Sequence, residues 1–341
     1  MSQPPVEQPL LHVDDLRITV GAGHADAVRA VSFDVQKGQT FGLVGESGSG
    51  KTLTCRAILG VLAPGCAVTG GRIDFNGANL VTASRKELDR VRSRHIGAVF
   101  QDPASYLNPS LTIGRQLSEV LRVKGGLGRK AAQVRSVELL ELVGMRNPQR
   151  VFGQYPHELS GGMLQRALLA IAVSCEPELL IADEATTALD VTVQAEVIEL
   201  LRTLRRELNL AIVFVSHDLA VISELCDRVA VFYAGEIVES GATRDVLVAP
   251  RHRYTKALLD VADTGGWQHR AERSAATRDG RLAVIPGQPP ALGVIAPGCA
   301  FAPRCGAAAA DCRAGDITRQ TERDREFRCI HPVAAMVEAA R

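Results

Sequence analysis

The chain has 341 residues, enough for about two domains with a sizeable core. Lys and Arg total 39 against 38 for Asp and Glu, so the chain lacks the strong basic field that sequence-independent nucleic-acid binding uses. The start, "MSQPPVEQPL", has neither the basic nor the apolar region of a signal peptide, and no apolar run approaches the length of a membrane span. We therefore expect a reducing compartment, in which metal binding or burial is favoured over disulfides for the eight cysteines.

The segment up to residue 102 is predicted to be rich in short strands. After a polar leader of residues 1–9, β-rich segments at "LHVDDLRITV", "AVRAVSFDV" and "TFGLVG" are separated by Gly and polar turns. An apolar helix, "LTCRAILGVL", and a further strand, "HIGAVFQD", follow.

The stretch "GESGSGKT" precedes that helix and fits the pattern G-x-x-x-x-G-K-[ST] without deviation. Its glycines let backbone N–H groups curl around phosphate oxygens, and the following helix directs its positive end at them. Lys51 is expected to reach the terminal phosphates of a nucleotide, and the Thr52 hydroxyl is expected to bind Mg²⁺. The predicted nucleotide-binding residues of this loop are Gly45, Glu46, Ser47, Gly48, Ser49, Gly50, Lys51 and Thr52.

Residues 103–165 are predicted to form a helical insert, because "IGRQLSEVLRV" and "KAAQVRSVELLELVG" place apolar residues at helical spacing. Beyond the insert, strands at "LLIADE", "AIVFVSHD" and "RVAVFYAGEIVESG" alternate with helices. Near-continuous apolar strands in such an alternation predict an α/β fold with a mostly parallel sheet that is covered on both faces.

The strand "LLIADE" ends in a pair of carboxylates. Its apolar residues predict a buried strand, whose end would deliver Asp183 to the Mg²⁺ beside the phosphate loop. The adjacent Glu184 is positioned to orient or deprotonate an attacking water.

The stretch "ELSGGMLQRALLA" places Ser160, Gly161 and Gly162 just before a helix, a second phosphate-cradling arrangement in one chain. One nucleotide does not need two cradles from one monomer, whereas two subunits meeting head to tail would use one cradle from each. Here the sequence resembles the ATP-binding-cassette (ABC) ATPases, whose signature is LSGGQ, with Met163 at the position where Gln is usual.

Other motifs of that family follow in the expected order, and the resemblance assigns their roles. It implies that Gln101 in "VFQDP" links Mg²⁺ to the helical insert, that Asp190 in "TALD" contacts the opposite subunit, and that His217 in "VSHD" touches the γ-phosphate. It covers roughly residues 10–250 and implies a P-loop NTPase cassette with a RecA-like core, a β subdomain and the helical insert. Family members usually have an aromatic residue upstream of the phosphate loop that stacks on adenine. This chain departs from that pattern, because His24 is the only ring in the corresponding stretch.

A finer resemblance begins at "APRHRYTKALL" and continues through "IPGQPPAL" and "GCAFAPRC". ATPase subunits of bacterial oligopeptide and dipeptide importers carry similar segments, so residues 251–341 are expected to be the C-terminal extension of that group. The resemblance implies an ATPase bound peripherally at the cytoplasmic side of the inner membrane. Its implied partners are two permease subunits, a second related ATPase and, indirectly, an extracytoplasmic binding protein, with no nucleic acid.

Two other functions stay open. A nickel or other small-solute importer of the same family would use the same ATPase, because substrate selectivity would lie in the other subunits. A non-transport ABC ATPase acting on nucleic acid or ribosomes is less favoured, because no basic arm, long coiled coil or second cassette is visible. The basic run "RKELDRVRSR" is read as a solvated helix face.

Four cysteines lie in the last part of the chain: Cys299, Cys305, Cys312 and Cys329. They are separated by five, six and sixteen residues, spacings that identify neither a structural zinc site nor a ferredoxin-like cluster. Four thiolates in a Pro- and Gly-rich segment favour a metal staple for a fold with little apolar content. The resemblance implies a 4Fe–4S cluster, as in some members of the group. Zinc is the second interpretation and a segment without metal is the third, and His331 is a further possible ligand.

Overall fold

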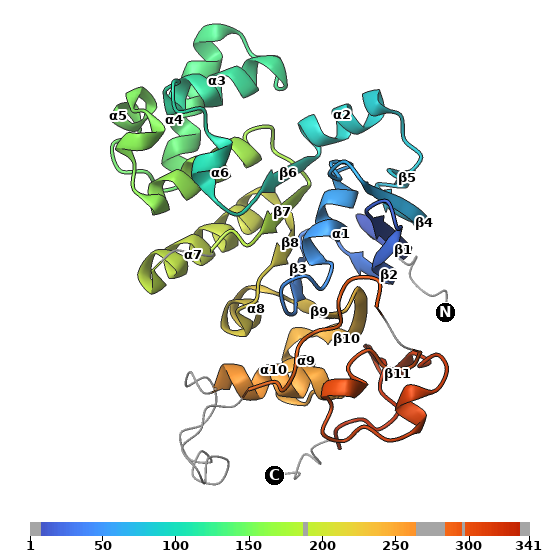
Figure 1. Cartoon of the computed structure of the whole chain (residues 1–341). Coiled ribbons are helices and arrows are strands. Elements are labelled where there is room, and N and C mark those ends of the chain that lie inside the picture. The colour runs from blue at the N-terminus through green and yellow to red at the C-terminus, as the bar shows by residue number, and fades with distance from the viewer. Residues whose placement is uncertain (1–7, 187–189, 264–283, 295–296, 335–341) are drawn as a thin grey trace, which may run out of the picture. The chain divides into compact units, whose positions relative to one another are not determined.

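The computed structural model describes residues 8–186, 190–263, 284–294 and 297–334 (Figure 1). The chain divides into two compact units, and each of them is assembled from separate stretches of sequence. The first unit comprises residues 1–11, 35–40 and 75–215, and the second comprises residues 12–34, 41–74 and 216–341.

The first unit is built on three neighbouring parallel strands, in the order β8–β7–β6. Registers such as Leu179 opposite Ala211 and Ile96 opposite Leu179 show that the strands run in the same direction. Every residue of β7 and β8 is buried, as the continuous apolar runs of their sequences predict. The strands of this unit are β5 (Ala78–Asn79), β6 (Ile96–Val99), β7 (Leu179–Asp183) and β8 (Ala211–Val215).

The helical insert predicted at 103–165 belongs to this unit. Its helices α3, α4 and α5 pack against one another, and α3 and α4 also contact α6 (Figure 1). The observed α3 has the bounds expected from apolar spacing, and its N-cap Thr112 accepts a hydrogen bond from the N–H of Arg115. The helices of this unit are α2 (Arg85–Arg94), η1 (Pro103–Tyr106), α3 (Ile113–Val123), α4 (Arg129–Leu142), α5 (Pro148–Gly153), η2 (Pro156–Glu158), α6 (Gly161–Val173) and α7 (Val191–Leu208).

The basic run at 85–94 is α2, as predicted. Ser84 and Glu87 form a reciprocal capping box at the N-terminus of α2, and none of the helix residues is buried. The run is therefore a solvated helix face.

The second unit contains two groups of strands. In one group the order is β2–β1–β4, and in the other it is β11–β12–β10–β9–β3. Strands β3 and β9 are parallel, whereas β10 pairs antiparallel with β9 and with β12. The strands are β1 (Leu11–Val20), β2 (Ala25–Val35), β3 (Thr40–Val44), β4 (Cys66–Phe75), β9 (Arg228–Tyr233), β10 (Glu236–Ala242), β11 (Gln320–Glu322) and β12 (Arg325–Phe327).

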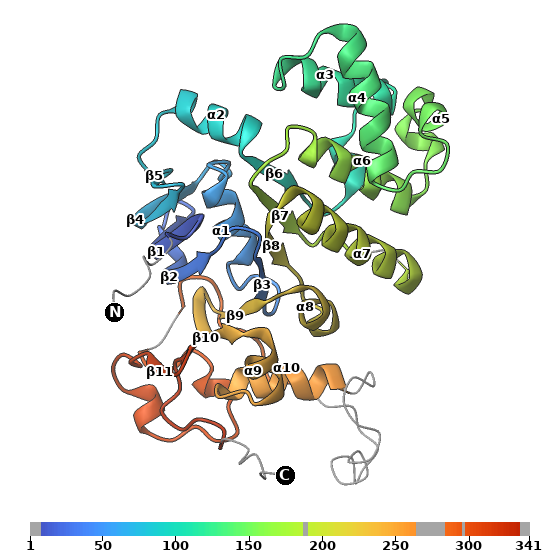
Figure 2. The ribbon, with the colours of Figure 1, turned by 180° about the vertical axis from the view of Figure 1, so that it is seen from behind.

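The described residues of the C-terminal part include a helix and short strands. Residues 253–263 form a helix that packs against α8 and α9 (Figure 2), although no helix was predicted there. β12 continues the sheet beyond β10, with Phe327 opposite Glu239. The domain boundary at residue 250 stays a prediction. The helices of this unit are α1 (Lys51–Ile58), α8 (Leu219–Leu225), α9 (Thr243–Val248), α10 (Arg253–Asp263), η3 (Ala302–Arg304) and η4 (Asp311–Arg313).

Candidate nucleotide site and cysteine cavity

The glycine-rich loop joins the buried strand β3 to α1 in the second unit, which is the context that its motif requires. Gly45 lies so close to β9 that an added Cβ would be 2.1 Å from the carbonyl oxygen of Phe232, so no larger residue fits there. Gly50, at φ 104°, caps α1 in a left-handed conformation. The loop therefore curls back over the start of the helix, whose positive end favours an anion.

Lys51 folds over this loop. Its side-chain nitrogen donates to the carbonyl oxygens of Gly45 (2.8 Å) and Glu46 (2.9 Å) and lies 3.2 Å from the hydroxyl of Ser49. The residue is only 5% exposed. A buried ammonium at the phosphate loop is suited to meet phosphate oxygens, because hydrogen bonds between an ammonium and a phosphate are charge-assisted and therefore strong.

His217 belongs to the same unit as the loop. It is exposed, between Ser216, whose N–H donates to the carbonyl of Leu43 in β3, and Asp218, which caps α8 through the N–H of Ala220. Because Leu43 lies two residues before Gly45, the neighbouring residue Ser216 is anchored at the strand from which the loop emerges.

The first unit carries two of the predicted Mg²⁺ ligands, Gln101 and Asp183, and the predicted base Glu184 at the carboxyl ends of parallel strands. β7 ends at the buried Asp183, and the N–H of Glu184 donates to the carbonyl of Val215 in β8. Val99 of β6 pairs with Ala182 of β7, so Gln101 leaves the sheet at the same edge as this carboxylate pair. In open α/β sheets this edge is where ligands bind.

The signature stretch begins α6 in the first unit. Ser160 is the exposed N-cap of this helix, and its hydroxyl accepts from the N–H of Met163 at 3.4 Å. Gly161 is also exposed, so this helix start is open on the surface of its own unit. Asp190 caps α7 by accepting from the N–H of Val193 at 2.9 Å, whereas residues 187–189 of "TALD" lie outside the described residues.

The predicted residues thus fall into two sets, each described within its own unit. The phosphate loop and His217 lie in the second unit, whereas Gln101, Asp183, Glu184, the signature and Asp190 lie in the first. The roles assigned to the individual residues stay predictions.

The four C-terminal cysteines line one cavity of about 20 Å³ in the second unit, with His252, Phe301 and His331 among its other walls. All four are free thiols. Burial raises the pKa of Cys299 to about 11 and also raises the pKa of Cys329, so these groups are neutral thiols without a cation. The shared cavity and its donor set fit a thiolate-bound metal centre, because a metal supplies the positive charge that deprotonated thiols need.

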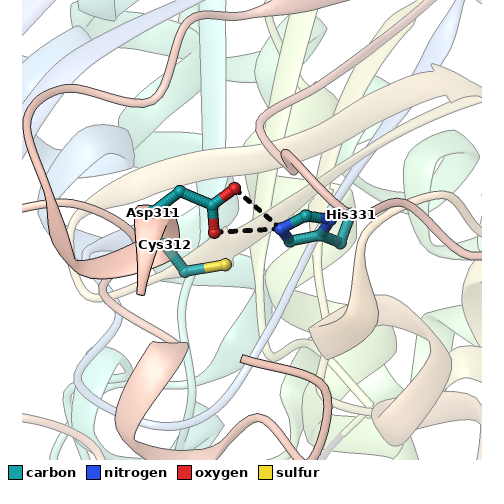
Figure 3. A group of neighbouring side chains, drawn as sticks. All are labelled: Asp311, Cys312 and His331. Carbon is teal, nitrogen blue, oxygen red and sulfur yellow. Dashed lines mark hydrogen bonds and ion pairs between the residues drawn. The ribbon is translucent and has the colours of Figure 1, made fainter. Parts of the chain in front are cut away.

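His331 carries a partner that the sequence did not indicate. Its Nε2 lies 2.9 Å from both carboxylate oxygens of Asp311, and the two side chains lie beside Cys312 (Figure 3). This contact lowers the pKa of Asp311. A carboxylate behind an imidazole orients the ring, as it does for many metal-binding histidines.

Of the scattered cysteines, Cys55 and Cys226 are buried, in agreement with their expected role as small apolar side chains. Cys66 and Cys175 are only half-buried, so that expectation does not extend to them.

The turn between β1 and β2 is where an aromatic residue that stacks on adenine would be expected. His24 is exposed in the turn between β1 and β2, and an added Cβ at Gly293 would lie 3.0 Å from the Cβ of its neighbour Ala25. The Pro-rich segment of residues 284–294 therefore reaches this turn, a contact that no local sequence signal indicated.

Comparison with known proteins decides the family. The family described as "ABC transporter" matches residues 28–187, and the family described as "Oligopeptide/dipeptide transporter, C-terminal region" matches residues 238–312. The dipeptide transport ATP-binding protein DppD of Bacillus subtilis (strain 168) is 44% identical over 299 residues, which cover 87% of this chain and 86% of the relative. The chain belongs to the oligopeptide/dipeptide group of ABC transporter ATP-binding proteins. The oligopeptide transport ATP-binding protein OppD of Escherichia coli (strain K12) is 41% identical over 330 residues, covering 96% of this chain and 95% of the relative.

Solved structures agree with the fold prediction. The ATP-binding cassette MJ0796, in a dimeric post-hydrolysis state bound to ADP and Pi, aligns with a TM-score of 0.61 at 26% identity, over 69% of this chain and 99% of that one. CbiO1 of Clostridium perfringens, part of the ABC transporter complex cbiONQ, aligns with a TM-score of 0.63 at 27% identity. The alignment covers 71% of this chain and 92% of CbiO1. The α/β P-loop cassette expected from the sequence is thereby confirmed. Within the described part of this ABC chain, every helix is too short or too polar to cross a membrane.

Proposed function

We propose that the chain is the ATP-binding and ATP-hydrolysing subunit that powers import of dipeptides or oligopeptides through a membrane ABC transporter. The observation that carries this proposal is the phosphate loop with its buried Lys51, in a chain that matches dipeptide and oligopeptide transport ATP-binding proteins over most of their length. A nickel or other small-solute importer is the second candidate, because an importer of that kind would use the same ATPase, with substrate selectivity in its other subunits.

Different residues of the chain have different roles in phosphoryl transfer. The loop N–H groups and Lys51 hold the phosphates and offset charge on the transferring group, and His217 contacts the γ-phosphate. The hydroxyl of Thr52 and the oxygens of Gln101 and Asp183 suit Mg²⁺, which prefers oxygen ligands and neutralises phosphate charge when bound. Glu184 orients the attacking water and accepts its proton.

The partners follow from the signature helix and from the family. Ser160 and Gly161 are exposed on their own unit, so their N–H groups are open to the nucleotide of a second ATPase subunit. MJ0796 supports this arrangement, since it was solved as a dimer with ADP and Pi. We propose attachment to two permease subunits at the cytoplasmic face of the membrane, with substrate delivered by an extracytoplasmic binding protein. The two composite ATP sites would be unequal where the second ATPase differs.

For the cysteine cavity we propose a 4Fe–4S cluster held by Cys299, Cys305, Cys312 and Cys329, with a structural role. The support is the convergence of four free thiols on one partly apolar cavity. Analysis of iron, zinc and acid-labile sulfide in anaerobically purified protein tests this, with Cys305→Ser as the variant and Cys175→Ser as the control. About four iron and four sulfide per chain, lost in Cys305→Ser, is the expected result. Stoichiometric zinc would replace the cluster by a zinc site, and a chain without metal would overturn the metal centre.

The function itself is tested by hydrolysis and by uptake. Glu184→Gln keeps the size of the side chain but cannot accept a proton, so we expect turnover to fall at least about a hundredfold while ATP still binds. In cells lacking this chain, uptake of labelled dipeptides and oligopeptides should be lost and should return with the wild-type copy but not with Glu184→Gln. Retained peptide uptake together with lost nickel uptake would establish the second candidate instead.

A further inference from the structure

The cysteine segment is tied to the phosphate loop through Arg304, which directly precedes Cys305. Its guanidinium donates to both carboxylate oxygens of Glu46, from Nη1 at 2.7 Å and from Nη2 at 2.9 Å. Glu46 is the second residue of the phosphate loop, and the side chain of Arg304 is only 5% exposed. A partly buried, bidentate ion pair of this kind has a defined geometry as well as a strong interaction.

The position of Arg304 is itself fixed on several sides. Its Nε donates to the carbonyl of Pro286 at 2.8 Å, and its guanidinium lies over the rings of Tyr233 and Phe301, at 5.8 and 6.0 Å from their centroids. These groups, like Glu46, all belong to the second unit. The guanidinium is therefore presented to the loop as a rigid fork.

Glu46 is held by its backbone as well. Its N–H donates to the hydroxyl of the fully buried Tyr254 at 2.9 Å. Its carbonyl oxygen accepts from the side-chain nitrogen of Lys51 at 2.9 Å. Whatever fixes the side chain of Glu46 therefore also fixes the carbonyl that orients the lysine meant for the phosphates.

We propose that Arg304 is a positioning residue for the nucleotide site, which holds Glu46 and through it Lys51, and so couples the cysteine segment to ATP affinity. This inference rests on the proposed ATPase function. It adds a role for the C-terminal extension, whose integrity sets the geometry of the phosphate loop. Because such coupling is reciprocal, bound nucleotide in turn stabilises the extension.

The direction in which two substitutions change ATP affinity distinguishes a positioning role from a purely electrostatic effect of the ion pair on ATP. Arg304→Gln removes a positive charge, and Glu46→Gln removes a negative one. If the pair acted on ATP only through space, the first would weaken binding of the polyanion and the second would tighten it. If Arg304 positions the loop, both substitutions release Glu46 and both weaken binding.

The experiment is a titration of the full-length chain with a fluorescent ATP analogue and Mg²⁺, with a melting curve for each variant. We expect Kd to rise about fivefold to tenfold for Arg304→Gln and for Glu46→Gln. The double variant should be no weaker than the weaker single one, because both remove the same contact. Arg304→Lys, which retains one charged contact, should recover part of the affinity. The matched control is Arg319→Gln, whose exposed partner Glu326 lies 3.0 Å away, and its Kd should stay within about twofold.

Three results overturn the inference: an unchanged Kd in both variants, tighter binding by Glu46→Gln, or additive losses in the double variant. If Arg304→Gln does not fold, Glu46→Gln decides alone, because the direction of its effect differs between the two explanations. A wild-type chain that binds no nucleotide would refute the proposed function itself, and the wild-type titration shows this separately.

Discussion

Replacing Gly97 by alanine tests how the signature helix is placed in its unit. Gly97 lies in β6, directly beneath α6, the helix that begins at the signature. A Cβ at this position would lie 2.4 Å from the carbonyl oxygen of Ala172 in α6 and 3.3 Å from the side chain of Leu180 in β7. Real Cβ atoms essentially never approach a heavy atom within 3.0 Å. Since the closest atom belongs to the backbone of a helix, α6 or β6 must shift.

The expected cost follows from this geometry. Overpacking of a well-packed core costs about 1–3 kcal/mol. For a domain of this size, each kcal/mol lowers the melting temperature by about 2–4 °C. Gly97→Ala is therefore expected to melt about 2–12 °C below the wild type. It should also hydrolyse ATP more slowly, because α6 carries Ser160.

Thermal unfolding followed by circular dichroism measures the first effect, and steady-state ATP turnover measures the second. Gly153→Ala is the matched control, because no atom lies within 4 Å of the Cβ that it would add. Its melting temperature should equal or slightly exceed that of the wild type. A Gly97→Ala variant that melts with the wild type would refute the close packing of β6 against α6.

Three further substitutions test single contacts. Tyr254→Phe keeps the ring but leaves the N–H of Glu46 without its acceptor, so a loss of about 1–2 kcal/mol in stability and weaker ATP binding are expected in melting and titration experiments. Asp190→Ala removes the cap of α7 and should cost about 1 kcal/mol, whereas Asp190→Asn should restore most of it; equal melting of both variants would contradict the capping role. Ser118→Ala breaks the buried hydroxyl pair with Ser136 between α3 and α4, 2.8 Å apart, and should lower the melting temperature while ATP affinity stays unchanged.

Local sequence signals located much of the cassette. The apolar runs at 179–183 and 211–215 are buried parallel strands, and the helical spacing at 113–123 is α3. The glycine-rich loop lies between a strand and a helix, as its motif requires. These features are readable because each depends on neighbours within a few residues: the side-chain period of a strand or helix, or the backbone freedom of glycine.

The secondary structure of the C-terminal part could not be predicted from local sequence patterns in the same way. Its helix at 253–263 was missed because the Pro- and Gly-rich composition around it concealed a short periodic stretch. Strand β12 has only three residues, too few to show alternation, and is defined by its pairing with β10.

The chain's own sequence determined that it binds nucleotide phosphates and that its core is an α/β cassette, since short contiguous motifs carry both facts. Only the tertiary structure showed that four cysteines, whose spacings match no standard metal-site pattern, line one cavity. It also showed that Arg304 forms an ion pair with Glu46, although the two residues are 258 positions apart in the sequence. Side chains so far apart in the chain meet because the packing of many intervening elements closes the loop between them. No local pattern encodes that closure, because it arises from burial and pairing of the whole unit.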